Sequence, residues 1–121
     1  MQQTDNTNPK MKLSEAIRAG AKLRPQGFGQ MYPNHGKECC ALGAAHDAAI
    51  GFENYRTKVA YEDLKEQFPE LTKQIRNNEY PPEAKFLYTD RSTLEALILD
   101  LNDADRWTRE QIADWLDGIG Y

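Results

Sequence analysis

The two histidines and two cysteines of the chain fall together between residues 35 and 46. They are His35, Cys39, Cys40 and His46. Zinc prefers four nitrogen and sulfur ligands of this kind. However, adjacent cysteines on a helix project about 100° apart, and the spacing matches none of the usual finger or ribbon patterns. We therefore expect no metal and no cofactor, and these four residues remain the alternative if a metal is bound.

The same residues also suggest a thiol nucleophile with a histidine base, because a helix N-terminus lowers the pKa of a cysteine. Nothing marks an oxyanion hole or a third group that would orient the base. Free cysteines often behave as small core residues, and we expect this of Cys39 and Cys40. We assign no catalytic residue and favour a non-enzymatic protein. The alternative is a small enzyme or ligand-binding protein that uses this cluster.

The elements that must position these residues are predominantly helical. Residues 39–50 are apolar nearly all round, which predicts a helix through the middle of the domain, closed by Gly51. An amphipathic helix is expected from Leu13 with Ser14 as its N-cap, ending before Pro25. The segment that follows Pro25 is rich in glycine. A loop and a small β element near 26–32 fit it equally well.

A third, shorter helix is predicted from the apolar residues Tyr61, Leu64 and Phe68, and Pro69 ends it. Residues 52–60 resemble a connection in composition. Leu71 and Ile75 indicate a further turn or two.

The C-terminal third predicts an αα-hairpin. Asn102 and Asp103 are expected to end its first helix, and Thr108 with Gln111 forms a capping box that begins the second. Trp107 is expected to pack onto the apolar stripe of this second helix. The apolar residues of the first helix are Leu94, Leu97, Ile98 and Leu101, and those of the second are Ile112, Trp115 and Leu116.

The sequence therefore predicts a mainly α, compact single domain of four or five helices over residues 11–121, after a flexible polar tail at 1–10. The chain has 121 residues, which is typical of one domain. No apolar run approaches the roughly 18 residues of a membrane span, and the N-terminus lacks the apolar core of a signal peptide. We expect a cytoplasmic protein with no membrane partner.

Two stretches resemble a family of small, uncharacterised proteins of bacteria and their phages. One is the CALGAA motif at 40–45, preceded by LSEAIRAGAKLRPQ at 13–26. The other is Leu-Asn-Asp at 101–103, followed by WTREQIADWL at 107–116. The family has no established activity, so the resemblance implies only a compact, mainly helical domain closed by the C-terminal hairpin.

The charge distribution argues against nucleic acid as the main partner. The net charge is −4, and residues 51–121 carry fifteen acidic against nine basic side chains. Nucleic-acid binders usually carry a basic stripe instead. An acidic surface suits a basic protein, such as a nucleic-acid-binding protein whose site the chain would mask. If the chain comes from a phage, inhibition of a host defence or nucleic-acid enzyme would be a natural form of this activity.

Aromatic residues outside the best helices are the candidates for such an interface, because tyrosine is enriched there. We therefore expect a non-catalytic interaction protein with a protein partner. The candidate binding residues, with the neighbouring histidine, are Phe28, Tyr32, His35, Tyr55, Tyr80 and Tyr88.

Overall fold

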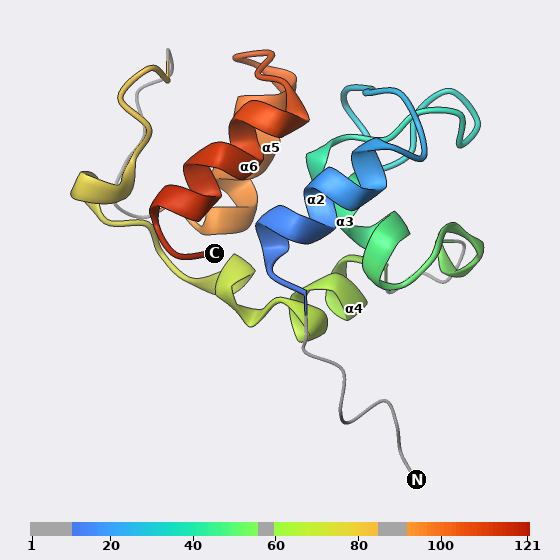
Figure 1. Cartoon of the computed structure of the whole chain (residues 1–121), viewed down its shortest axis with the longest axis horizontal. Coiled ribbons are helices and arrows are strands. Elements are labelled where there is room, and N and C mark those ends of the chain that lie inside the picture. The colour runs from blue at the N-terminus through green and yellow to red at the C-terminus, as the bar shows by residue number, and fades with distance from the viewer. Residues whose placement is uncertain (1–10, 56–59, 85–91) are drawn as a thin grey trace, which may run out of the picture.

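The computed structural model describes residues 11–55, 60–84 and 92–121, and this part of the chain contains five α-helices (Figure 1). The mainly α prediction is confirmed. The predicted tail at 1–10 lies outside the described residues. The α-helices are α2 (Leu13–Ala21), α3 (Ala41–Ala49), α4 (Ala60–Gln67), α5 (Leu94–Asp103) and α6 (Arg109–Gly118), and the 3₁₀ helices are η1 (Phe52–Asn54), η2 (Pro69–Thr72) and η3 (Asn77–Glu79).

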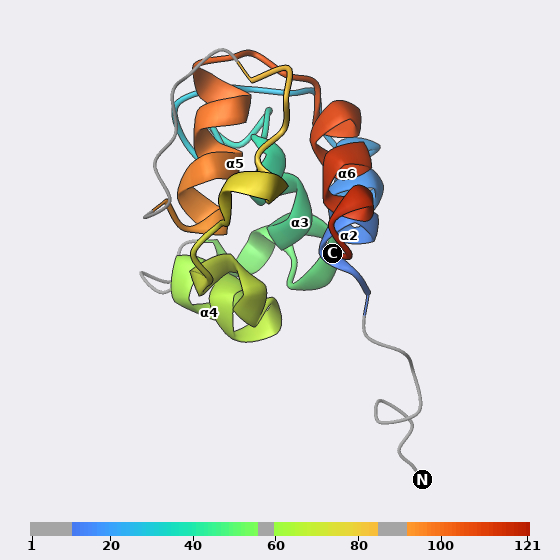
Figure 2. The same ribbon diagram turned by 90° about the vertical axis from the view of Figure 1, so that its left-hand side faces the viewer.

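Helix α3 is the central element, as its apolar sequence predicts. It contacts α2, α4 and α5, and Figure 2 shows it between α5 on one side and α2 and α6 on the other. Small residues allow this packing. A Cβ atom on Gly20 of α2 would lie 1.8 Å from the carbonyl oxygen of Ala44 in α3. A Cβ atom on Gly43 would lie 2.1 Å from the carbonyl oxygen of Met31. The two helix backbones therefore meet where glycine removes the side chain.

The start of one helix differs from the prediction. The N-cap of α2 is Lys12, two residues before the expected Ser14, and Ser14 is buried in the first turn. The Ser14 hydroxyl donates to Asp117 at 2.5 Å instead of capping its own helix. Helix α5 ends at Asp103, as predicted, and Asn102 lies in its last turn. Both polar side chains bond to distant segments, which local capping rules do not consider.

The glycine-rich segment after Pro25 contains no strand among its described residues, so the small β element near 26–32 is wrong. One isolated parallel bridge pairs Gln26 with Cys39. The amide of Gly27 donates to the carbonyl oxygen of Cys39 at 3.0 Å. The amide of Cys39 donates to the carbonyl oxygen of Pro25, also at 3.0 Å. The segment therefore folds back as a loop onto the start of α3. At the other end of α3, Gly51 has a φ of 113°, a backbone conformation that favours glycine. Gly51 therefore follows the helix as predicted.

The middle of the chain is made of short helices. Helix α4 ends at Gln67, two residues before Pro69, close to the predicted end. The further turn predicted around Leu71 is the 3₁₀ helix η2. Residues 52–54 of the predicted connection form η1, while 56–59 lie outside the described residues.

Helices α5 and α6 contact each other as the predicted αα-hairpin. The Thr108 hydroxyl accepts from the amide of Gln111 at 3.0 Å, and the Gln111 side chain accepts from the amide of Thr108 at 2.8 Å. The capping box is therefore confirmed.

All five α-helices contribute to one cluster of buried residues. Its largest members include Ile17, Leu42, Leu64, Leu101 and Ile112, one from each helix. None of the helices in the described ranges is long and apolar enough to cross a membrane.

Candidate functional site

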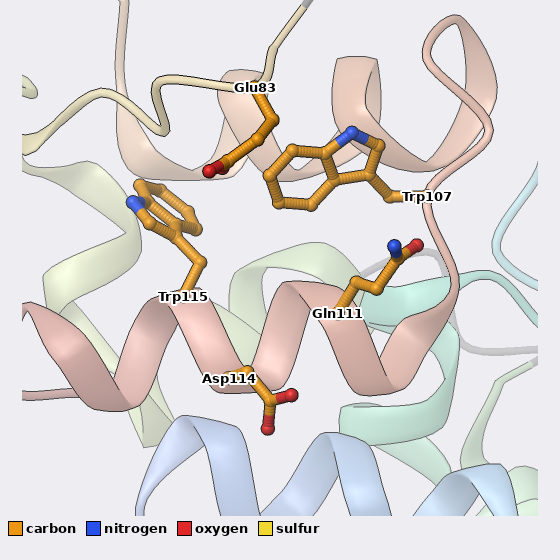
Figure 3. A pocket seen from close by; sticks show the side chains of 5 residues that line it. All are labelled: Glu83, Trp107, Gln111, Asp114 and Trp115. Atoms are coloured by element: carbon orange, nitrogen blue, oxygen red, sulfur yellow. The ribbon is translucent and has the colours of Figure 1, made fainter.

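An open cavity of about 350 Å³ lies on the outer face of α6. We call it the tryptophan groove and define it by Glu83, Trp107, Gln111, Asp114 and Trp115 (Figure 3). The capping box starts α6 directly after Trp107, and Gln111 and Trp115 lie one turn apart on that helix. The chain has only two tryptophans, and both line the groove. Apolar walls with a few polar groups are typical of binding sites.

The wall formed by Trp115 is anchored. Its indole Nε1 donates to the carbonyl oxygen of Glu79 in η3 at 2.8 Å. Both indoles are partly buried and pack against the core. The site is therefore built from two segments, α6 and the chain around η3, that are far apart in sequence.

The two carboxylates of the groove have different surroundings. Asp114 points away from both indoles toward α2, while the Glu83 side chain extends between them (Figure 3). The Asp114 carboxylate accepts from Nη2 of Arg18 at 2.5 Å. Glu83 is exposed and has no ion-pair partner among the residues that the structure describes. Within the described residues, Glu83 is therefore the carboxylate of the groove that has no ion pair.

Arg18 holds α6 against α2. Its guanidinium lies 2.6 Å from Glu110, 2.5 Å from Asp114 and 2.8 Å from Asp117. The hydrogen bonds from Ser14 and Arg18 lower the pKa of the Asp117 carboxyl. This ion cluster lies on the side of α6 that faces α2, which leaves the tryptophan side of α6 facing outward.

The sequence prediction missed the tryptophan groove. Trp107 and Trp115 are assigned there to packing, and the groove shows them as neighbours on an open surface. The signal was the spacing, because residues 107, 111 and 115 recur every four positions. The spacing does not reveal Glu83, because this residue reaches the groove from another segment of the chain.

A second hollow, of about 510 Å³, contains three of the six predicted binding residues: Tyr32, His35 and Tyr55. We call it the aromatic hollow, and its remaining lining residues are Gln30, Asn34, Gly36 and Phe52. Asn34 and His35 both have a φ of 57°, which is uncommon outside glycine. The Tyr32 ring meets the Phe52 and Tyr55 rings edge-on at 4.9 and 4.7 Å between centroids. The aromatic side chains therefore pack mainly on one another.

Tyr32 also connects the hollow to the interior. Its hydroxyl oxygen lies 2.7 Å from Nδ1 of His46, and both side chains are buried. Nε2 of His46 has no hydrogen-bond partner within the described ranges. Burial lowers the pKa of His46, against the opposing charges of Asp47, Asp63 and Glu53. His46 is therefore neutral at pH 7.

Both cysteines are buried in the core, where the sequence places them. Burial raises the pKa of Cys40 to about 11. Burial also raises the pKa of Cys39, although the Arg109 guanidinium, which donates to its Sγ at 3.2 Å, opposes that shift. Neither thiol is an activated nucleophile in this environment.

The four residues of the predicted metal alternative have separate surroundings. His35 lines the aromatic hollow, whereas His46 bonds to Tyr32 and the two thiols accept from Arg109 and Gly43. The described part of the chain contains no group of three or more His, Cys, Asp or Glu side chains suited to hold a metal ion.

Two further predicted binding residues, Phe28 and Tyr80, line neither of these two sites. Phe28 is 37% exposed, and the Arg106 guanidinium lies over its ring at 4.0 Å from the centroid. Tyr80 is partly buried against the core, next to the Glu79 carbonyl that anchors Trp115. Tyr88 lies outside the described residues.

The Leu-Asn-Asp motif has a structural role in this chain. Asn102 is fully buried, and its Oδ1 accepts from the amide of Ala41 at 3.1 Å and from Gln26 at 2.9 Å. Its Nδ2 donates to the carbonyl oxygen of Gly27 at 3.1 Å. Asn102 therefore connects α5, the start of α3 and the loop after Pro25.

The fold and the groove together define a small helical domain with an open, aromatic, acidic surface site. Comparisons with protein-family models, with curated proteins and with solved structures found no match. The resemblance to small bacterial and phage proteins therefore stays a prediction.

Proposed function

We propose that this chain is a small, non-catalytic interaction protein that docks on a basic protein partner. The observation that carries the proposal is the tryptophan groove, where two indoles form an open cavity beside the Glu83 carboxylate. Tryptophan is enriched at the energetic centres of protein interfaces. A pair of indoles next to a carboxylate that has no ion pair within the described residues suits a partner that carries positive charge.

The charge of the surrounding surface supports the same partner class. From Asp90 onward the chain carries eight carboxylates and three arginines. Three of those carboxylates lie in the ion cluster with Arg18, and Arg109 is buried among backbone carbonyls and the Cys39 thiol. A negative surface around an apolar site speeds the encounter with a basic partner and disfavours nucleic acid. A nucleic-acid-binding protein is the natural partner, because the chain would cover its basic site.

Salt dependence of binding to a basic peptide tests this function. The probe is a capped peptide of six arginines, measured by calorimetry in about 50 mM and about 300 mM salt, with a capped peptide of six glutamates as the control. We expect binding of the arginine peptide that weakens in the higher salt, and no binding of the glutamate peptide. Absence of binding in low salt, or an affinity that salt does not change, would contradict the proposal.

A ligand-binding protein is the second candidate, and the aromatic hollow is the feature that favours it. The hollow contains His35 but not the other three residues of the predicted cluster. Chemical-shift changes of the Gln30 and Asn34 side-chain amides on addition of small planar compounds would support this candidate. Unchanged shifts across a diverse compound set would count against it.

A further inference from the structure

We propose that the tryptophan groove binds a single arginine side chain of the partner, with Glu83 as its counter-ion. This inference rests on the proposed function, since it names the chemistry that the same site recognises. Three features of the groove carry it: the two indoles, the orientation of the two carboxylates, and the absence of an internal cation among its described lining residues.

The indoles supply the apolar walls. Trp107 and Trp115 lie on either side of the end of the Glu83 side chain (Figure 3). Tryptophan is the best aromatic partner of a cation, and a guanidinium stacks on its face. Because the Trp115 indole is fixed by its hydrogen bond to Glu79, one wall is held in place before a ligand arrives.

The carboxylates select the position of the cation. The Asp114 carboxylate forms an ion pair with Arg18 and points toward α2, so its charge is already balanced by a residue of the same chain. Glu83 places its carboxylate between the indoles without an ion-pair partner in the described ranges. A guanidinium that enters the groove beside Glu83 would stack on an indole and pair with both carboxylate oxygens of Glu83. The ammonium group of lysine offers no planar fork, so arginine is the better fit.

Arginine guanidinium groups lie over aromatic rings at two other places in the chain. The guanidinium of Arg24 lies 4.2 Å from the Phe52 ring centroid, and that of Arg106 lies 4.0 Å from the Phe28 ring centroid. Arg24 is also paired with the Asp47 carboxylate at 2.8 Å. Each of these aromatic rings has an internal arginine, whereas no lysine or arginine lines the groove within the described residues. As far as the structure describes its lining, the groove thus offers the aromatic surface and the carboxylate of such a site without a cation.

The size of the cavity fits one side chain. Its volume of about 350 Å³ is at the lower end of the range for ligand sites, roughly 300–1,000 Å³. This volume leaves room for one arginine side chain, so we expect the partner to insert one arginine and to rest on the rim.

The experiment uses the full chain and the two indole N–H signals of its nitrogen-15 NMR spectrum. Because both tryptophans of the chain line the groove, both signals report on it directly. The probes are capped six-residue peptides of arginine and of lysine. We expect both indole signals to move with the arginine peptide, and the lysine peptide to bind several-fold more weakly. The Glu83→Gln variant should weaken arginine binding about tenfold, because it removes the charge and keeps the shape.

The matched control is Glu62→Gln, which removes one exposed carboxylate from α4. It should change the affinity less than about twofold, since its only effect is to make the net charge of the chain less negative. Trp107→Leu should also weaken binding, and its folding is checked by the thermal midpoint before affinity is compared.

The outcomes separate the inference from the function on which it rests. If both peptides bind equally, with unmoved indole signals and equal effects of E83Q and E62Q, the arginine site is overturned and docking on basic partners stands. If neither peptide binds in low salt, both are overturned. An arginine preference that E83Q removes and E62Q preserves supports both.

Discussion

The hydroxyl oxygen of Tyr32 lies 2.7 Å from Nδ1 of His46, inside the part of the core next to α3. Tyr32 is 3% exposed and His46 is fully buried, so this hydrogen bond joins two buried side chains. Burial raises the pKa of the Tyr32 hydroxyl and lowers that of the His46 imidazole. The pair is therefore stable as neutral phenol and neutral imidazole.

Stability should fall as the pH drops below about 6.5, because unfolded His46 gains a proton near its ordinary pKa while folded His46 resists protonation. Since the folded pKa is lowered, the contribution is complete above pH 6.5 and is lost toward acid. The slope for one proton is at most about 1.4 kcal/mol per pH unit. Urea unfolding at pH 8, 7, 6 and 5 measures this loss.

The His46→Gln variant should flatten the pH dependence between pH 7 and 5, whereas His35→Gln should leave it unchanged. His35 is the matched control because it is exposed and is the only other histidine. An equal acid sensitivity in wild type and H46Q would contradict the assignment to His46.

The two thiols should react slowly in the native protein, because both are buried and burial raises the pKa of each. We expect iodoacetamide at neutral pH to modify neither cysteine within the time that modifies both in urea. Mass spectrometry of the intact chain counts the added groups. Rapid labelling of one cysteine in the folded protein would favour the catalytic alternative instead.

Gly20→Ala should destabilise the protein by about 2–3 kcal/mol, because the new Cβ would lie 1.8 Å from the Ala44 carbonyl oxygen and must separate α2 from α3. Gly118→Ala is the matched control, since a Cβ there meets nothing within 4 Å. The control should gain about 0.5 kcal/mol by restricting the unfolded chain. Chemical unfolding measures both. Equal effects of the two substitutions would contradict the close approach of α2 and α3.

Asn102→Ala should cost about 3 kcal/mol, because it leaves the Ala41 amide and the Gly27 carbonyl without their buried partner. The matched control Asn78→Ala changes an exposed asparagine in η3 and should stay within about 0.5 kcal/mol. A small effect of N102A would mean that the loop after Pro25 does not depend on this side chain.

The positions of the helices could be predicted from local sequence patterns. The apolar segment 39–50 predicts the central helix α3, and the Thr108–Gln111 capping box predicts the start of α6, because both signals act within a few residues. Where a polar side chain bonds to a distant segment, local patterns mislead. Ser14 is predicted as the N-cap of its helix, but it lies in the first turn of α2 and bonds to Asp117. The end of α5 near Asn102 is predicted correctly, but the local pattern does not show that Asn102 accepts from the amide of Ala41.

The candidate site could not be predicted from local patterns either, because contacts between distant segments form it. The sequence contains the periodic spacing of Trp107, Gln111 and Trp115, but it does not show that Glu83 reaches the same groove or that Asp114 is drawn away by Arg18. Three of the predicted binding residues, Tyr32, His35 and Tyr55, do meet in the aromatic hollow. Helix periodicity is a property of neighbouring residues, whereas the charge of a groove depends on which segments the packed core brings together.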